Sequence, residues 1–531
     1  MADLSAFRDL DYMEQVMLLK EITDSKDSEA LEGLLDLQAE PIGDTAVDYM
    51  VTTALHAVLS ANEDKAVEGL SSPDPKVRDL CIKACVEHGF TGAATTLAEM
   101  AEEEEDEDVA FDILTALSRL KDPDTLDVFR KRLHDDDPFI ASLCLDVVAE
   151  HKDEASMEDF KEIVRESEED ENYLQCDITT WKAVNALGAI GTDDALAFLA
   201  TYLHHKNPTA RRIITDTLVY VGPPATPHVA DMFETTTSKD DRILCANVLG
   251  FIGDKKGGDA LVEALDAGKI EDPNLKYAVY EALGRIGGMK SVICLMDALA
   301  DEDEMILMAV VRAMDKNVNP GLAAKLVETI KAGGSQSARI GRAIIGGQAV
   351  NIFKAIYPDP AVGTFLIRVL GKSKDPEVIT TFREALEEMD SDQAKADLAA
   401  VASMEVQQAG LRILAADDSK SMLALYRGVI TDMGHTPLPA TNGAEAYDYV
   451  EQGEEVSMVI TDMNMPVMDG IELVQKIRDT EGLADIPVLM ITTESESSQR
   501  GMAEQSGVNA FLNKPFGREQ LVEIIEQMLP K

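Results

Sequence analysis

The sequence has few aromatic residues and few basic ones for its length. Aromatic residues make up 5% of its 531 positions, and 48 lysines and arginines stand against 98 aspartates and glutamates, giving a formal net charge of -50. Such a surface repels phosphate backbones, so we expect no nucleic-acid ligand. The acidic run at residues 102–108 could dock a basic partner, but a solvated acidic turn is the favoured interpretation.

Cysteine is scarce, and long apolar runs are missing. Cys81 and Cys85, two of six cysteines, lie four residues apart without a second pair to complete a zinc set, so we expect them in a helix core. The pair His204 and His205 lacks a metal-binding pattern nearby and is expected in a solvated turn. With no secretion signal and no apolar run of membrane-spanning length, we expect a reducing, cytoplasmic location and no membrane contact.

A half-apolar nonapeptide recurs through the first part of the chain. Four of its copies end on glycine, at Gly191, Gly222, Gly253 and Gly287, with intervals of 31, 31 and 34 residues. Glycine after an apolar helical pattern is a signal for a helix C-terminus, and a second amphipathic stretch follows before an acidic or proline-bearing turn. A fixed period in this range predicts a solenoid of helix pairs. Small residues in the repeated helix predict close packing between neighbouring helices.

These segments resemble HEAT-like repeats, in particular the short form also found in phycobilin lyases, over about residues 30–400. The tetratricopeptide signature is missing, one unit is lengthened around residues 153–180, and the period weakens beyond residue 317. The resemblance implies an all-α solenoid with an extended surface for a protein partner that the sequence does not identify. A receiver-controlled, bilin lyase-like enzyme is a weaker alternative.

The last part of the chain alternates short apolar runs with amphipathic stretches of helical length. The runs at 412–416, 457–461 and 486–491 end at the pair Asp417 and Asp418, at Asp462 and at Thr492. This alternation predicts a parallel α/β sheet, and ligands of such sheets lie beyond the carboxyl ends of the strands. We therefore expect these four residues and Lys514 to converge.

The convergence has a chemical purpose. Three crowded carboxylates repel one another, and a hard divalent cation, Mg²⁺ above all, would relieve the repulsion through oxygen ligands and keep Asp462 ionised and nucleophilic. Lys514 offers a positive charge to a phosphate oxygen, and the Thr492 hydroxyl can donate a hydrogen bond to another. In-line phosphoryl transfer needs mainly such positioning and charge neutralisation. The expected product is an aspartyl phosphate.

Residues 411–529 resemble the receiver domain of two-component response regulators, closest to the single-domain chemotaxis type. The motif consists of the five residues above together with Met465 and Pro466, residues 468–470 and 514–516. The resemblance implies a doubly wound, flavodoxin-like fold with a five-stranded parallel sheet. It also implies phosphorylation on Asp462 by a histidine kinase or a phosphotransfer protein.

The same resemblance assigns the remaining roles. Asp418 and Asp462 would bind the metal directly, Asp417 through water, and the main-chain carbonyl of Asn464 would be the third protein ligand. Thr492 and Lys514 would contact the phosphoryl group and couple it to a shift of the ring at Phe511.

Two positions depart from the family pattern. Phe511 lacks the hydroxyl of the tyrosine found there in chemotaxis regulators, so a switch would rest on ring packing, and a plain core ring is an equally good interpretation. Thr493 is bulkier than the usual alanine or glycine and would narrow access to the phosphoryl group. Asn464 and Glu494 are suited to holding an attacking water, which favours self-dephosphorylation.

Taken together, the sequence predicts HEAT-like repeats over 1–405, a linker at 406–410 and a receiver over 411–531. The leading hypothesis is a response regulator in which phosphorylation controls the protein interactions of a HEAT-repeat scaffold, with no dedicated enzymatic domain. Control would act through intramolecular docking or through receiver dimerisation. The alternative is a phosphate sink in a chemotaxis-like pathway.

Overall fold

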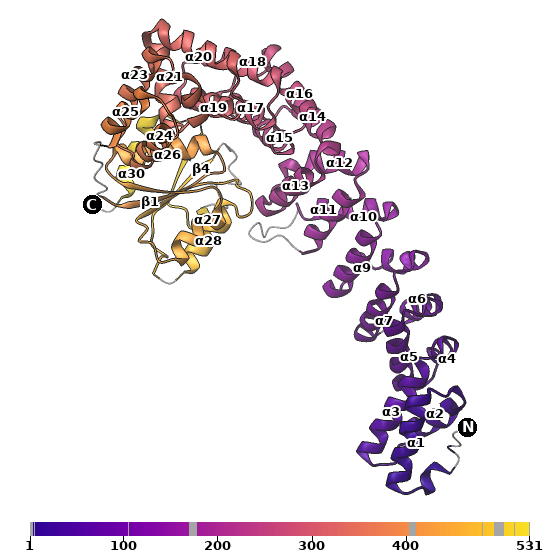
Figure 1. The fold of residues 1–531 in the computed structure, drawn as a ribbon. Coiled ribbons are helices and arrows are strands. Elements are labelled where there is room, and N and C mark those ends of the chain that lie inside the picture. The colour runs from indigo at the N-terminus through magenta and orange to yellow at the C-terminus, as the bar shows by residue number, and fades with distance from the viewer. Residues whose placement is uncertain are drawn as a thin grey trace. The chain divides into compact units, whose positions relative to one another are not determined.

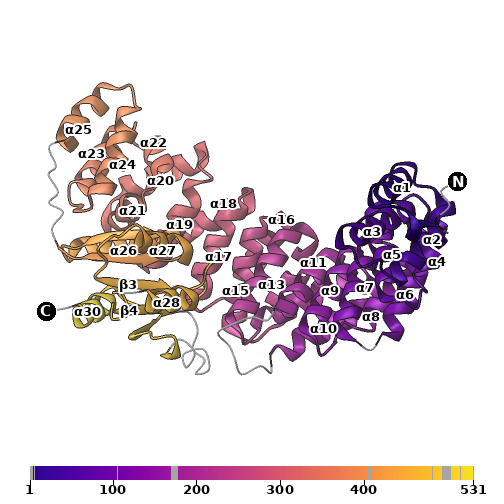
Figure 2. The same cartoon turned by 90° about the horizontal axis from the view of Figure 1, so that it is seen from below.

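The computed structural model describes residues 4, 6–104, 106–168, 178–402, 410–480, 482–492, 504–514 and 516–529. The chain forms two compact units, Met1–Phe160 and Lys161–Lys531, drawn in Figures 1 and 2. In the described residues the first unit is helical, and the second continues the helices and ends in a five-stranded sheet. The predicted combination of a helical solenoid and an α/β domain is confirmed. The predicted domain limits, 1–405 and 411–531, stay a prediction.

The first unit consists of successive short helices, with most of the apolar residues buried between them. Its helices are α1 (Tyr12–Ser25), α2 (Leu31–Ala39), α3 (Thr45–Leu59), α4 (Glu63–Gly69), α5 (Pro75–His88), α6 (Ala94–Glu103), α7 (Glu107–Leu120), α8 (Leu126–Arg130), α9 (Pro138–Glu150) and α10 (Met157–Glu166), the last of which crosses into the second unit.

The helices of the second unit continue the same pattern. They are α11 (Ile178–Ile190), α12 (Asp193–Thr201), α13 (Pro208–Val221), α14 (Thr226–Thr235), α15 (Lys239–Ile252), α16 (Lys255–Asp266), α17 (Pro273–Ile286), α18 (Met289–Asp297), α19 (Glu304–Asp315), α20 (Pro320–Ala332), α21 (Gly334–Gly346), α22 (Val350–Ile356), α23 (Pro360–Leu370), α24 (Pro376–Glu387) and α25 (Asp392–Ala402).

Helix α17 illustrates how the repeated segment folds. Asp272 accepts hydrogen bonds from the first turn, Pro273 occupies the first helical position, and Gly287 ends the helix with a φ of +71°. A cap of this kind is worth about 1 kcal/mol, and proline is pre-organised for a helix start. The four glycines that the period singled out all have positive φ, so their prediction as helix ends is confirmed.

Close packing between repeats depends on glycine at two positions. A Cβ atom on Gly250 of α15 would lie 2.8 Å from the Cα atom of Ala282 in α17. A Cβ atom on Gly284 of α17 would lie 2.5 Å from the Cα atom of Ala313 in α19. Both contacts are too short for a side chain, so α15, α17 and α19 touch backbone to backbone, as the small residues predict.

Two predictions about individual residues have opposite outcomes. Cys81 and Cys85 are fully buried in α5 with free thiols, which confirms the core interpretation. The solvated turn predicted for the histidine pair is wrong for His205, which is buried and accepts a hydrogen bond from the Asn207 backbone. Its other ring nitrogen lies 3.0 Å from the Ser167 hydroxyl. Burial lowers the pKa of His205, so packing favours the neutral ring.

The C-terminal domain is a doubly wound parallel sheet with strand order β2-β1-β3-β4-β5. The elements are β1 (Arg412–Ala416), α26 (Lys420–Asp432), β2 (Thr436–Ala440), α27 (Gly443–Glu451), β3 (Met458–Asp462), α28 (Gly470–Asp479), β4 (Val488–Thr492), β5 (Ala510–Asn513) and α30 (Arg518–Met528). Among the described residues, helices α26, α27 and α28 follow strands β1, β2 and β3, and α30 follows β5. Such helical crossovers let neighbouring strands run parallel. The predicted fold class is confirmed.

Helices cover both faces of the sheet (Figure 1). Apolar residues of α26 and α30 pack with the sheet in one core, and those of α27 and α28 pack with it in the other. Strands β1, β3 and β4 carry runs of fully buried side chains, which is why their sequence is continuously apolar. Both views place α26 beside α19 and α21 of the repeats, and these helices are in contact.

No helix in the described parts of the chain combines the length and the apolar character that crossing a membrane requires.

Candidate functional site

Three aspartates meet at the carboxyl ends of β1 and β3. Asp417, Asp418 and Asp462 bring carboxylate oxygens within 4.8 Å of one another. They converge because β1 and β3 pair in register, with Ala416 opposite Thr461, so that the residues after both strands share one edge. Hard carboxylate oxygens in a cluster of this size suit a small divalent cation such as Mg²⁺.

Asp417 is completely buried and its carboxylate is already engaged by three donors. One oxygen accepts from the Ser419 backbone N–H at 2.9 Å. The other accepts from the Tyr426 hydroxyl at 2.9 Å and from Lys514 Nζ at 3.0 Å. The sequence motif does not include Tyr426, although its position nine residues after Asp417, on the buried face of α26, is a usable signal.

Lys514 links the acidic cluster. Its Nζ atom lies 3.0 Å from Asp417 Oδ2 and 3.3 Å from Asp462 Oδ2. Burial alone would lower the pKa of Lys514, but the charges of Asp417 and Asp462 outweigh it and raise the pKa. Burial raises the pKa of Asp462 well above its usual range, with the repulsion of Asp417 and Asp418 adding to the rise and Lys514 opposing it. The positive charge of Lys514 therefore does not fully offset the three carboxylates.

Asp418 is the most accessible of the three carboxylates, with 18% of its side chain exposed. Burial and the neighbouring Asp417 raise its pKa to about 6, while Arg285 opposes the rise. A cation bound at this edge would remove the repulsion that raises both pKa values.

The remaining predicted site residues lie around the cluster. Thr492 ends β4, is buried, and its hydroxyl lies 3.9 Å from the Met463 sulfur. Asn464 is half-buried in the loop after β3. Phe511 is a half-buried ring of β5 that packs against the core beneath α27 and α28. Thr493 and Glu494 lie outside the described residues, so the predictions made for them stay predictions.

The loop from Asp462 to Gly470 needs its glycine for a close backbone contact. A Cβ atom on Gly470 would lie 2.1 Å from the Asp462 carbonyl oxygen. With no side chain there, α28 starts against the end of β3, and the Gly470 N–H donates to the Met463 carbonyl at 2.8 Å. Asp469 caps α28 in a reciprocal capping box with Glu472. This contact explains the Asp-Gly pair of the motif.

Comparison with known proteins agrees with this geometry. The family model described as the response regulator receiver domain matches residues 413–526. The chemotaxis protein CheY homolog of Campylobacter jejuni is 38% identical over 120 residues, which are 22% of this chain and 92% of that protein. The chain belongs to the response regulators. CheY1 of Helicobacter pylori is 34% identical over 120 residues, 22% of this chain and 97% of that protein.

The rest of this response regulator and its solved relatives complete the comparison. The family model described as HEAT repeats matches residues 63–149 and 226–315. The structure of CheY4 of Vibrio cholerae has 31% sequence identity and a TM-score of 0.22, covering 23% of this chain and 100% of that chain. The receiver match lies C-terminal to both repeat matches.

The repeats contact the receiver at the edge that holds the acidic cluster. Four residues of α17, spaced three or four apart and so on one face of the helix, point to the receiver: Asn274, Tyr277, Glu281 and Arg285. The Asn274 amide donates to the main-chain carbonyl of Lys514. The Ser419 hydroxyl donates to Glu281 at 2.8 Å and is also hydrogen-bonded to Tyr277.

The fourth residue of this face reaches the cluster itself. Arg285 Nη2 lies 3.9 Å from Asp418 Oδ2 and 3.7 Å from a Glu281 oxygen. The guanidinium also stacks over the Phe251 ring of α15, 4.2 Å from its centroid. A second repeat helix, α13, contributes Arg212, which pairs with Glu472 of α28 at 3.2 Å. None of these contacts follows from the sequence motifs.

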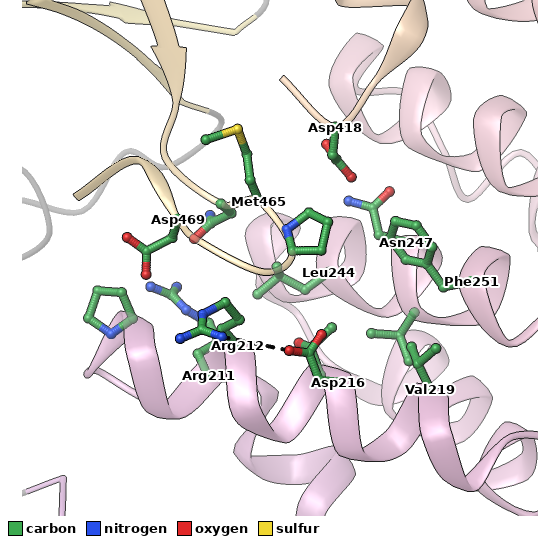
Figure 3. A pocket seen from close by; sticks show the side chains of 15 residues that line it. Arg211, Arg212, Asp216, Val219, Leu244, Asn247, Phe251, Asp418, Met465 and Asp469 are labelled. Carbon is green, nitrogen blue, oxygen red and sulfur yellow. Dashed lines mark ion pairs between the residues drawn. The ribbon is translucent and has the colours of Figure 1, made fainter. Parts of the chain in front are cut away.

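A cavity of about 180 Å³ separates α13 and α15 from the loop after β3 (Figure 3). Asp418 of the receiver and Asn247 of α15 face this space, and Arg212 pairs with Asp216 on its floor. Asn464 and Pro466 line the receiver side. The acidic cluster is thus covered by α17 on one side and opens toward this cavity on the other.

Asp469 gives the site a testable pH dependence. It is buried, its Oδ2 atom has no hydrogen-bond partner among the described residues, and burial, followed by the charge of Glu472, raises its pKa to about 6. Because this folded-state value exceeds the usual value of about 4, the stability from this group is present below about pH 4 and lost as the pH rises through about 6. Asp469→Asn keeps the cap, so it should be more stable than wild type by about 2 kcal/mol at pH 7.

Urea unfolding of the two proteins at pH 4.5 and pH 7 measures this effect, and the advantage of the variant should shrink toward the lower pH. Asp303→Asn is the matched control, since it makes the same change at the exposed N-cap of α19. An equal advantage at both pH values would contradict the assignment to Asp469.

Proposed function

We propose that this response regulator accepts a phosphoryl group on Asp462 from a histidine kinase or a phosphotransfer protein, and that phosphorylation controls how its receiver docks on its HEAT repeats. The observation that carries the proposal is the placement of the docking contacts. Arg285 pairs with Asp418, Asn274 holds the Lys514 carbonyl, and Ser419 binds α17. The repeats therefore bind the edge of the receiver at which its state would change.

The proposed reaction is a single transfer of a phosphoryl group to Asp462. An oxygen of Asp462 forms a bond to the phosphorus, the bond from phosphorus to the donor nitrogen or oxygen breaks, and the leaving group takes up a proton. Lys514, held between two carboxylates, neutralises charge on the transferred group, and the Thr492 hydroxyl donates to one of its oxygens. This division of labour fits a reaction that needs positioning and electrostatic stabilisation more than covalent help.

Mg²⁺ is the cation that fits the cluster best. Asp418 and Asp462 would bind it directly, Asp417 through water, and the Asn464 carbonyl would complete the protein ligands. The bound ion supplies the positive charge that the three carboxylates lack, which lowers the pKa of Asp462 and offsets the charge of the incoming phosphoryl group.

Docking and occupancy of the site are coupled because both use Asp418. Asp418 would attract Arg285 less strongly if it also held a cation, and Lys514, whose carbonyl Asn274 holds, would have new surroundings beside a phosphoryl group. Couplings between sites are commonly about 1–3 kcal/mol. We infer that the occupied receiver docks more weakly. The freed faces of α13 and α17 then become available to a partner protein.

Hydrogen–deuterium exchange of the full chain tests this proposal. With acetyl phosphate and Mg²⁺, we expect the backbone amides of α13, of α17 and of the segment around Ser419 to exchange faster. The expected increase in exchange rate is about 5- to 100-fold. Asp462→Ala treated in the same way is the control and should show no phosphorylation-dependent change. A pull-down with the full chain as bait, carried out with and without acetyl phosphate, identifies proteins that bind only after the receiver has undocked.

The outcomes separate the hypotheses. Phosphorylation without any change in exchange or in bound proteins would refute switchable docking and favour a phosphate sink. Absence of phosphorylation in the wild-type protein with either acetyl phosphate or phosphoramidate would refute the phosphoryl-acceptor role itself.

A further inference from the structure

A second and larger cavity also lies between the repeats and the receiver, bounded by α19, α21 and α23 of the repeats and α26 of the receiver. Its volume is about 450 Å³. Six basic residues line it: Arg339, Arg342, Arg368, Lys372, Lys374 and Arg518. In a chain with 98 acidic and 48 basic residues, this concentration of positive charge is unusual. We call it the basic cavity.

The acidic residues of the basic cavity are already neutralised by other partners. Glu304 pairs with Arg342 at 2.7 Å, Asp432 pairs with Arg518, and both oxygens of Asp375 accept from Nη2 of Arg427. These pairs leave the other four cations without a compensating charge inside the cavity.

Those four cations make no ion pair or side-chain hydrogen bond with any part of the chain that the structure describes. They are Arg339, Arg368, Lys372 and Lys374. Arg339 is half-buried, and its Nε atom is shielded from solvent without a partner in the described chain. A shielded guanidinium N–H without an acceptor is costly, and an anion bound in the cavity would supply the acceptor. Docking of the receiver does not explain why Arg339 is placed here, because the ion pairs between receiver and repeats are made by other arginines.

The chemistry of the cavity selects its ligand. Arginine forks bind phosphate oxygens in pairs, and lysines add point charges. The rest of the lining is apolar and includes Met305, Met308, Phe365, Val369 and Leu425, which suits an organic group beside the phosphates. The volume falls within the usual range of about 300–1,000 Å³ for small-molecule sites.

We propose that the basic cavity binds a phosphorylated organic anion of nucleotide size, held by Arg339 and Arg368 with Lys372 and Lys374 close by. Because the cavity has repeats on one side and α26 on the other, the bound anion contacts both and stabilises the docked receiver. The chain then has a second input, separate from Asp462. This inference does not rest on the proposed phosphorylation.

Isothermal titration calorimetry of the full chain in metal-free buffer tests the proposal, with ATP, inorganic triphosphate and adenosine as probes. We expect saturable one-to-one binding of ATP, weaker binding of triphosphate and none of adenosine. Arg339→Gln and Arg368→Gln should each weaken ATP binding at least about tenfold, the loss expected for one charged hydrogen bond. Arg368 is exposed, so its replacement leaves the fold intact.

Two control variants complete the test. Lys331→Gln removes an exposed charge that pairs with Asp359 outside the cavity, and Asp462→Asn removes the acceptor carboxylate. Both should bind ATP like wild type. Failure of ATP and triphosphate to bind, or equal binding by the arginine variants, would overturn the proposal. Tighter binding of a polyglutamate peptide than of either probe would also overturn it, since the cavity would then be a protein-docking surface.

Discussion

Replacing Asp462 with asparagine is expected to abolish phosphorylation and to stabilise the metal-free protein. Asparagine keeps the shape and can still accept the 2.9 Å hydrogen bond from the Met463 N–H, but it is not a nucleophile. It also removes one of three crowded carboxylates, a group whose pKa is raised by burial and, to a smaller extent, by repulsion from Asp417 and Asp418. The gain in unfolding free energy should be on the order of 1 kcal/mol, a common exchange of stability for function.

Intact-mass spectrometry after treatment with acetyl phosphate and Mg²⁺ measures the first effect, and urea unfolding in EDTA measures the second. Asp479→Asn, at the exposed end of α28, is the matched control and should behave like wild type in both. A phosphorylated Asp462→Asn protein would show that another carboxylate accepts the group. A loss of stability would show that the attraction of Lys514 exceeds the repulsion within the cluster.

Replacing Arg427 with methionine should weaken receiver docking by about 3–5 kcal/mol. Arg427 of α26 makes two hydrogen bonds to Asp375 of the repeats, at 3.1 and 3.2 Å, and a third to Glu377 at 2.6 Å. The side chains of Arg427 and Asp375 are 8% and 7% exposed. Removing the arginine leaves a buried carboxylate without its counter-charge, which costs more than the lost pair contributes.

The double variant Arg427→Met with Asp375→Asn should recover more than half of that loss. Asparagine retains the N-cap of α24 while removing the orphaned charge. Exchange protection of α24 and α26 measures docking in each protein. Arg412→Met is the control, because its pair with Glu454 lies within the receiver and is partly exposed, where such pairs are worth about 1 kcal/mol or less. If the double variant docks as poorly as the single one, charge burial is not the cause.

The sequence predicts most of the receiver site because the site follows strand order. Asp417, Asp462, Thr492 and Lys514 each follow or end a short apolar run, and parallel strands bring such positions to one edge whatever the loops do. The same holds for the repeat glycines, since a helix C-terminus is a local feature. Local patterns of this kind can be found in a single chain.

Docking could not be predicted in the same way. Asn274 and Lys514 are 240 residues apart, and their contact depends on the shapes of two folded surfaces. Arg285 occupies a position where the preceding repeats carry Phe251 and Tyr220, so the repeat alignment marks it as different without saying why. His205 was mispredicted for a related reason, because turn composition says nothing of what packs over the turn.

The backbone contacts at Gly250 and Gly284 have a mechanical consequence. In a helical solenoid each repeat contacts only its neighbours, and most of these contacts are made by side chains. Between α15, α17 and α19 no side chain separates the backbones at two points, because the glycines at positions 250 and 284 let these helices touch. This closely packed section is also the one that contacts the receiver, through α17 and α19. A displacement of the receiver would therefore be transmitted to three helices that are packed against one another without intervening side chains.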